Sequence, residues 1–102
     1  MRIITVPDFS GDGAVYSLAS LLGVPANTLV RGLLMREVTA GTTHTRVGDQ
    51  NVSATRGIPL STTDSLPLPG VGAIYGESPM WNLSEVYVYA ATGDILAIAY
   101  IP

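Results

Sequence analysis

The sequence predicts an all-β fold, namely an antiparallel β-sandwich or jelly-roll-like barrel of about seven or eight short strands. Short apolar segments alternate with turn residues along the whole chain, and the eleven Gly and seven Pro are spread out rather than clustered. The segments near the C-terminus are rich in β-branched and aromatic residues, which favour strands. A chain of 102 residues without a linker or an internal repeat is expected to form a single domain over residues 1–102.

The first quarter of the chain contains a strand, a turn and one segment with two interpretations. Residues 2–6 predict a strand that stops at Pro7, and residues 10–13 predict a turn, because two glycines around an aspartate supply positive φ. Residues 14–22 fit a helix through the spacing of their Val and Leu residues, while their first positions also fit the start of a strand. Residues 23–27 then break the chain with Gly and Pro.

The middle of the chain predicts further short strands. In residues 29–38 neither of the two alternating faces is cleanly polar, so we expect a strand that is covered on both sides at least in part. Residues 43–47 are rich in β-branched residues and predict another strand. Residues 57–60 predict an edge segment, because Pro59 lacks the N–H that a central strand would donate. Residues 61–72 predict a loop with one brief strand.

The strongest strand signal lies near the C-terminus. Residues 85–90 and residues 95–101 are separated by a Gly-containing turn, which predicts an antiparallel hairpin. Tyr87 and Tyr89 share one face of the first strand, and Tyr100 on the returning strand is expected to join them. We interpret this tyrosine cluster as core or interface packing, with a sugar-stacking platform as the alternative.

The composition excludes several classes of protein. Only 13% of the residues are charged, against about 25% in a typical soluble chain, and 47% are hydrophobic, which argues against disorder. The five cations are all Arg and the net charge is -3, which argues against nucleic-acid binding. Because no apolar run approaches ~18 residues, we expect no membrane-spanning helix. The apolar stretch within residues 1–7 is also too short for a signal peptide.

The sequence offers little chemistry, so we expect a protein that is not an enzyme. His44 is the only candidate base, and its hydroxyl-rich surroundings predict that it faces solvent. One His and no Cys argue against zinc, and no calcium loop or phosphate-binding loop occurs. We therefore expect no catalytic, cofactor-binding or metal-binding residues. The weakest alternative is a small hydrolase that pairs acids in space, such as Asp8 with Asp12 or Glu77 with Glu85.

The surface residues point to contact with other subunits. Ten Thr and eight Ser replace many of the usual charges, which suits faces that are covered by a partner. Residues 73–76 predict a further strand, and residues 77–82 predict the loop that carries the only Trp. In that loop Met80 and Trp81 are candidate interface anchors, with a lid over one end of the sandwich as the alternative. The candidate arginines for pairing with a partner's carboxylates, or else simply solvated, are Arg31, Arg36, Arg46 and Arg56.

Several turn and strand patterns are similar to those of a known family. They are the Gly-Asp-Gly turn at residues 11–13, the stretch Arg46-Val47-Gly48-Asp49 running on to Gly57-Ile58-Pro59-Leu60, and residues 83–94 followed by an apolar strand. Together they resemble the small structural proteins that tailed bacteriophages encode. The resemblance covers most of residues 42–101 and, more loosely, residues 3–18.

The resemblance implies a bacteriophage virion structural protein, most plausibly a capsid decoration or cement protein. Such proteins are β-rich and often dimeric or trimeric. They lie on the capsid surface across neighbouring subunits of the major capsid protein, and they stabilise the mature head. The expected partners are thus the major capsid protein and further copies of this chain, without nucleic acid or membrane, after synthesis in the host bacterial cytoplasm. The alternative, motivated by the tyrosines and the hydroxyl-rich faces, is an adhesin or glycan-binding β-sandwich module on the virion surface.

Overall fold

A computed structural model describes residues 2–39, 44–63, 65–68 and 80–102 of this chain. In the described residues the strands and the helix, in chain order, are β1 (Ile4–Thr5), β2 (Phe9–Ser10), β3 (Val15–Ser17), α1 (Leu18–Leu22), β4 (Leu29–Val30), β5 (Gly32–Thr39), β6 (Arg46–Gly48), β7 (Ile58–Pro59), β8 (Leu66–Leu68), β9 (Trp81–Asn82), β10 (Tyr87–Tyr89) and β11 (Ile95–Ile101). Every pair of strands is antiparallel in this part of the chain.

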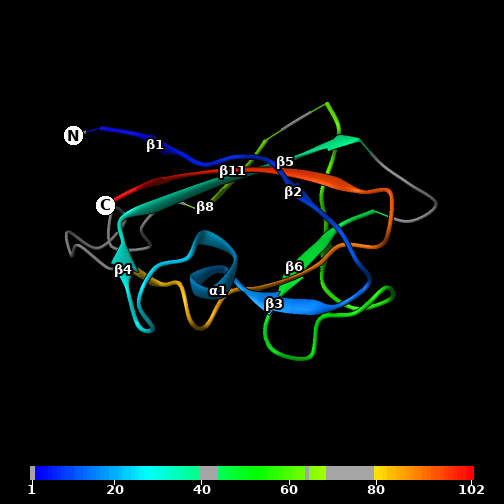
Figure 1. The fold of residues 1–102 in the computed structure, drawn as a ribbon, viewed down its shortest axis with the longest axis horizontal. Helices are drawn as coiled ribbons and strands as arrows, with labels where there is room; N and C mark the ends of the chain where they lie inside the picture. The colour runs from blue at the N-terminus through cyan, green and yellow to red at the C-terminus, as the bar shows by residue number, and fades with distance from the viewer. Residues whose placement is uncertain (1, 40–43, 64, 69–79) are drawn as a thin grey trace.

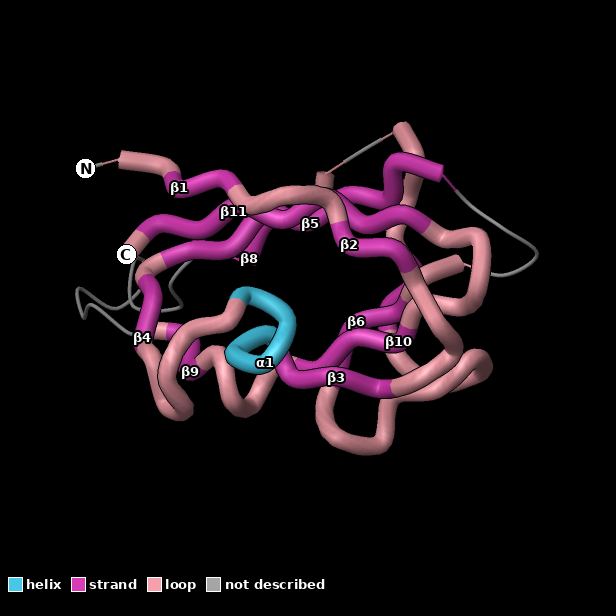
Figure 2. The backbone as a smooth tube through the Cα atoms, viewed as in Figure 1, coloured by secondary structure: helices cyan, strands magenta, loops and turns pink. Residues whose placement is uncertain are grey.

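The strands form two main sheets with a core between them. The first sheet has the order β1-β11-β5-β8, with β2 also paired to β11, and the second has the order β3-β10-β6-β7. In Figure 1 the first sheet runs along the top of the molecule, and β3, β6 and α1 lie along the bottom. A two-stranded sheet of β4 and β9 closes one end, beside α1 (Figure 2). The all-β, sandwich-like prediction is therefore confirmed.

The described residues hold eleven strands, more than the seven or eight expected. The extra strands arise where one predicted segment is divided or a predicted loop is paired. Residues 29–38 divide at Arg31 into β4 and β5, which belong to different sheets. Trp81 was expected in a loop, but Trp81–Asn82 is a strand whose Trp81 lies opposite Val30. Residues 73–76 lie outside the described residues.

The core is built from alternate residues of both sheets and from α1. Its buried members are Leu18, Ala19, Val30, Leu33, Met35, Val47, Leu60, Leu83, Val86, Val88, Leu96 and Ile98. In β5 the residues between the buried ones face outward, and Leu34 and Val38 are exposed. The described residues thus cover one face of this strand, where the sequence predicts partial cover on both. The edge strand β7 and the brief strand β8 occur where the sequence predicts them.

The segment with two interpretations contains both predicted structures in succession. Residues Val15–Ser17 pair with β10, and α1 begins directly after them. The Ser17 side chain accepts a hydrogen bond from the Ser20 amide, which satisfies one free N–H of the first turn. Gly23 ends the helix with φ 68°, a conformation that favours glycine. The helix is short because Ser17, which begins it, and Gly23, which ends it, are only six residues apart.

The predicted C-terminal hairpin is wrong. β10 pairs with β3 and β6, whereas β11 pairs with β1, β2 and β5, so the two strands lie in different sheets. The connection between them is a corner, in which the Asp94 amide donates to the Ala91 carbonyl at 3.0 Å. The segment around Gly11 packs against this corner, where the Gly11 amide donates a hydrogen bond to the Asp94 carbonyl at 2.9 Å. A turn signal between two half-buried strands predicts a reversal, but it does not decide which sheet the second strand joins.

The expected cluster of three tyrosines is therefore not formed. Tyr87 and Tyr89 do share one face of β10, whose intervening Val88 is buried. Tyr100 lies in the first sheet between Ile4 and Leu33, and it packs against the core. The sugar-stacking interpretation loses the arrangement on which it depended.

Candidate functional site

The first sheet exposes a flat, weakly polar surface, which we call the outer face. It is formed by Thr5, Leu34, Arg36, Val38, Ala97 and Ala99. The register places Ala99 between Thr5 and Leu34, and Ala97 beside Arg36. The two half-buried alanines leave a shallow groove of about 350 Å³ between larger neighbours, with Asp8 and Arg36 among its lining residues. This arrangement can bury apolar surface against a flat partner.

Trp81 helps to line a second depression, the Trp81 groove, on the other side of the fold. Its lining residues are Val47, Gly48, Asp49, Ile58, Trp81, Glu85 and Val86, around a volume of about 270 Å³. A neighbouring polar hollow of about 240 Å³ shares Asp49 and Glu85 with this groove. Trp81 was singled out from the sequence as an interface anchor and Glu85 only as one half of an acid pair with Glu77, whereas Asp49 and Ile58 were not expected at a site. Nothing local in the sequence joins them, because they approach one another only through the pairing of β6 with β7 and β10.

The structure places the predicted anchors side by side but separates the predicted arginines. Met80 is exposed, and the adjoining Trp81 is half-buried against the core. Arg36 lies on the outer face of the first sheet, while Arg46 belongs to the second sheet. The Arg46 Nη1 donates to the Gly57 carbonyl at 2.9 Å. The exposed residues Arg31 and Arg56 lie outside the strands. The partner contacts of these residues remain a prediction.

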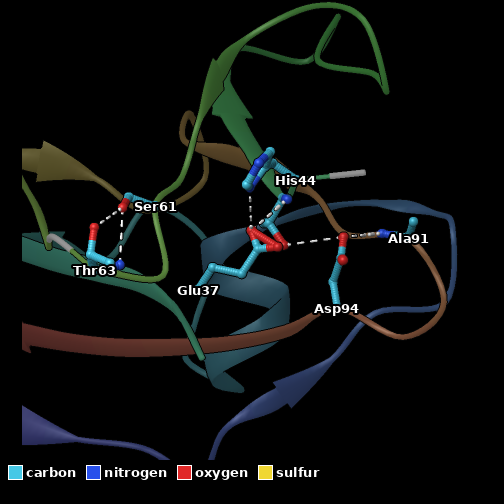
Figure 3. Close-up of polar contacts among 7 residues, drawn as sticks. Glu37, His44, Ser61, Thr63, Ala91 and Asp94 are labelled. Atoms are coloured by element: carbon cyan, nitrogen blue, oxygen red, sulfur yellow. Dashed lines mark hydrogen bonds and ion pairs between the residues drawn. The ribbon is translucent and has the colours of Figure 1, made fainter. Parts of the chain in front are cut away.

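A buried acid lies at the end of the sandwich where β5 leads toward β6. Glu37 is fully buried, and its Oε2 accepts a hydrogen bond from the Thr45 amide at 2.9 Å. The same oxygen lies 3.7 Å from Nδ1 of His44. Figure 3 marks this contact by a dashed line between the two side chains. The other oxygen, Oε1, has no hydrogen-bond partner in the described part of the chain. Asp94, also buried, accepts from the Ala91 amide at 3.0 Å and from the Thr45 hydroxyl at 3.5 Å.

The surroundings of Glu37 make its charged form costly. Burial raises the pKa of Glu37, and the negative charge of Asp94 raises it further. The Thr45 hydrogen bond and His44 act in the opposite direction. The His44 side chain is 55% exposed, as its hydroxyl-rich surroundings predict.

The acid pairs expected from the sequence were Asp8 with Asp12 and Glu77 with Glu85, not Glu37 with Asp94, and Glu77 lies outside the described residues. A usable signal was present, because Glu37 falls on the same alternating face of its strand as Leu33 and Met35. In the residues that the structure describes, no three His, Asp or Glu side chains are grouped to hold a metal ion. The one helix in this part is too short to cross a membrane.

Comparison of the chain with protein-family models, with curated proteins and with solved structures finds no match.

Proposed function

We propose that this chain is a structural protein of a bacteriophage virion, a capsid decoration protein that binds as a homo-oligomer across neighbouring subunits of the major capsid protein. The observation that supports it best is the outer face of the first sheet. This face presents Leu34 at 37% exposure and Val38 at 43% exposure beside small alanines. The turn and strand patterns that resemble phage structural proteins are the second support.

The outer face has the properties of a surface that packs against a flat partner. Small side chains on β11 allow close approach, and exposed aliphatic side chains on β5 supply apolar area. The opposite charges of Asp8 and Arg36 at the shallow groove can fix the orientation of the partner. Few other charged side chains would have to be desolvated on contact, since only 13% of the residues of the chain are charged.

The mechanism is selective binding to one state of the shell. A protein that binds the expanded shell more tightly than the unexpanded shell stabilises the expanded state by that difference in affinity. Each copy is expected to bury on the order of 1,200–2,000 Å². Contact with two capsid subunits at once raises the effective concentration of the second contact.

The test compares two matched variants on heads that lack this protein. Leu34→Glu places a charge on the outer face, and Val15→Glu makes the same kind of change at similar exposure, 40%, on the second sheet. We expect the wild-type chain and Val15→Glu to raise the temperature at which heads burst, and Leu34→Glu to leave it unchanged. Equal protection by both variants would remove the outer face from the mechanism, and no protection by the wild-type chain would end the proposal.

The alternative, a glycan-binding adhesin, loses one of its two supports, because Tyr100 lies in a different sheet from Tyr87 and Tyr89. Its other support is the hydroxyl-rich surface, which the capsid proposal accounts for equally well.

A further inference from the structure

The Trp81 groove combines apolar walls with an acidic rim. Val47 and Val86 are buried at its base, while Ile58 is 56% exposed at its edge. Trp81 adds an aromatic surface, held in place by the pairing of β9 with β4. Asp49 and Glu85 also line the groove, and both are exposed.

Among the residues that the structure describes, no cation lies within ion-pair distance of either carboxylate. Within the described ranges, the one ion pair closer than 4.0 Å is that of His44 with Glu37, elsewhere in the fold. The Oδ1 atom of Asp49 accepts a hydrogen bond from the Asn51 amide at 2.9 Å, which orients this carboxylate and leaves its charge uncompensated. Arg46, the cation on the adjoining strand, donates to the Gly57 carbonyl.

The neighbouring polar hollow continues the acidic side of the groove. Asp49 and Glu85 lie in both depressions, and Gln50, Ser84 and Tyr87 complete the second. The strand register explains why Asp49 and Glu85 lie close together. Tyr87 lies opposite Gly48 in the antiparallel pair, so the residue after β6 and the residues before β10 are at the same end of the sheet. A ligand in the apolar groove therefore directs its polar end toward two carboxylates.

We propose that the Trp81 groove binds an arginine side chain of a partner protein. It lies between the second sheet and the β4–β9 pair, away from the outer face, and its occupation by arginine does not depend on the capsid function. The aliphatic stem packs against Ile58 and the two valines, as long cationic side chains do on apolar surfaces. The guanidinium pairs with the carboxylates of Asp49 and Glu85 and contacts the face of Trp81.

Arginine fits this site better than lysine or a neutral ligand. Its planar group has five N–H donors and can pair with two separate carboxylates, while an ammonium acts as a point charge. Guanidinium is also less strongly hydrated and stacks on aromatic rings. A neutral sugar would leave the two negative charges without a counter-ion.

The test uses a capped Gly/Ser peptide with one central arginine, and the same peptide with citrulline, which keeps the shape and removes the charge. Trp81 is the only Trp of the chain, so its fluorescence reports on the groove directly. Amide NMR shifts of Gly48 and Val86 locate the contact. We expect the arginine peptide to perturb both signals and to bind about tenfold more tightly than the citrulline peptide.

Three charge-matched variants separate the groove from general electrostatics. Asp49→Asn keeps an acceptor for the Asn51 amide, and Glu85→Gln changes an exposed side chain, so neither disturbs packing. Each is expected to weaken the arginine peptide by about threefold to fivefold. Asp8→Asn makes the same change in net charge on the first sheet and is expected to leave the affinity unchanged.

Several results would overturn the assignment. They are equal affinity for the two peptides, an equal loss in Asp8→Asn, and no response of Trp81 up to the solubility limit of the peptide. A Trp81 response to a neutral oligosaccharide but not to the peptide would assign the groove to glycans. A dimer that dissociates in Asp49→Asn and ignores the peptide would assign it to an arginine of a second copy.

Discussion

At the scale of single residues, Glu37 is the side chain that least resembles an ordinary core residue. It occupies an inward position of β5 that follows the buried Leu33 and Met35 on the same face, and one of its oxygens has no partner among the described residues. Alternation in the sequence predicts the direction in which Glu37 points. It does not predict that Thr45 and Asp94 lie close to it, because Thr45 comes from the residue before β6 and Asp94 from the corner before β11.

The first prediction concerns the pH dependence that Glu37 causes. Its pKa is raised on folding, so the folded state binds a proton more readily than the unfolded state. Its contribution to stability is present at pH below its ordinary pKa and is lost as the pH rises through the raised value. Glu37→Gln removes the charge, and we expect it to raise the free energy of unfolding at pH 7 by about 1 kcal/mol.

Urea unfolding of the wild-type chain and of Glu37→Gln between pH 4 and pH 8 measures this effect. The gain from Glu37→Gln is expected to grow as the pH rises through this range. A variant that is less stable than the wild-type chain at pH 7, by a margin that widens with pH, would show that the buried charge is well compensated.

The second prediction concerns Asp12 and Tyr16, close to the corner between β10 and β11, where Gly11 and Gly13 are bonded to Asp94 and Ala90. The Tyr16 hydroxyl donates to Asp12 Oδ2 at 2.5 Å, and this hydrogen bond lowers the pKa of Asp12 and raises that of Tyr16. Tyr16→Phe keeps the edge-to-face contact with Phe9 and removes the donor. We expect the pKa of Asp12 to move up toward its ordinary value in an NMR titration. An unchanged Asp12 titration would mean that the hydrogen bond is not formed in solution.

At the scale of elements, local signals predicted most strands but not their partners. Pro59 correctly marked an edge strand, and Ser17 and Gly23 carry the signals that begin and end α1. The separation of β10 from β11 could not be predicted, because the same turn serves a hairpin and a corner. What selects the corner is a contact distant in sequence, the docking of Gly11 against the chain after β10.

The third prediction follows from that contact. A Cβ atom on Gly11 would lie 2.3 Å from the Ala91 carbonyl oxygen, so the backbone must move to accept alanine. We expect Gly11→Ala to lower the free energy of unfolding by about 3 kcal/mol. Gly48→Ala is the matched control, because its Cβ would meet neighbours at 3.7 Å and the cost is expected to stay below about 1 kcal/mol. If thermal unfolding shows that Gly11→Ala and Gly48→Ala lose the same stability, the corner between β10 and β11 can move away from residue 11 at little cost.

At the scale of the whole molecule, the sandwich carries different chemistry on its two sheets. The outer face of the first sheet is weakly polar and has a shallow groove, while the Trp81 groove between the second sheet and β9 has an acidic rim. The composition predicted a protein that acts through its surfaces. It could not predict which residues share a surface, because Ile58, Trp81 and Glu85 come from separate elements.

The fourth prediction is the oligomeric state. A decoration protein that bridges neighbouring subunits is expected to be a dimer or trimer, so light scattering should give two or three times the chain mass of 10.7 kDa. If the outer face contacts the capsid rather than another copy of this chain, the Leu34→Glu variant is expected to have the same oligomeric mass as the wild-type chain. A wild-type monomer at all concentrations would contradict the homo-oligomer.

Co-sedimentation of the purified chain with emptied phage heads tests the proposed capsid role most directly. We predict that the chain pellets with expanded heads in a fixed ratio to the major capsid protein and stays in the supernatant with unexpanded heads. A chain that remains in the supernatant with both kinds of head, and that is missing from purified virions, would contradict the proposal.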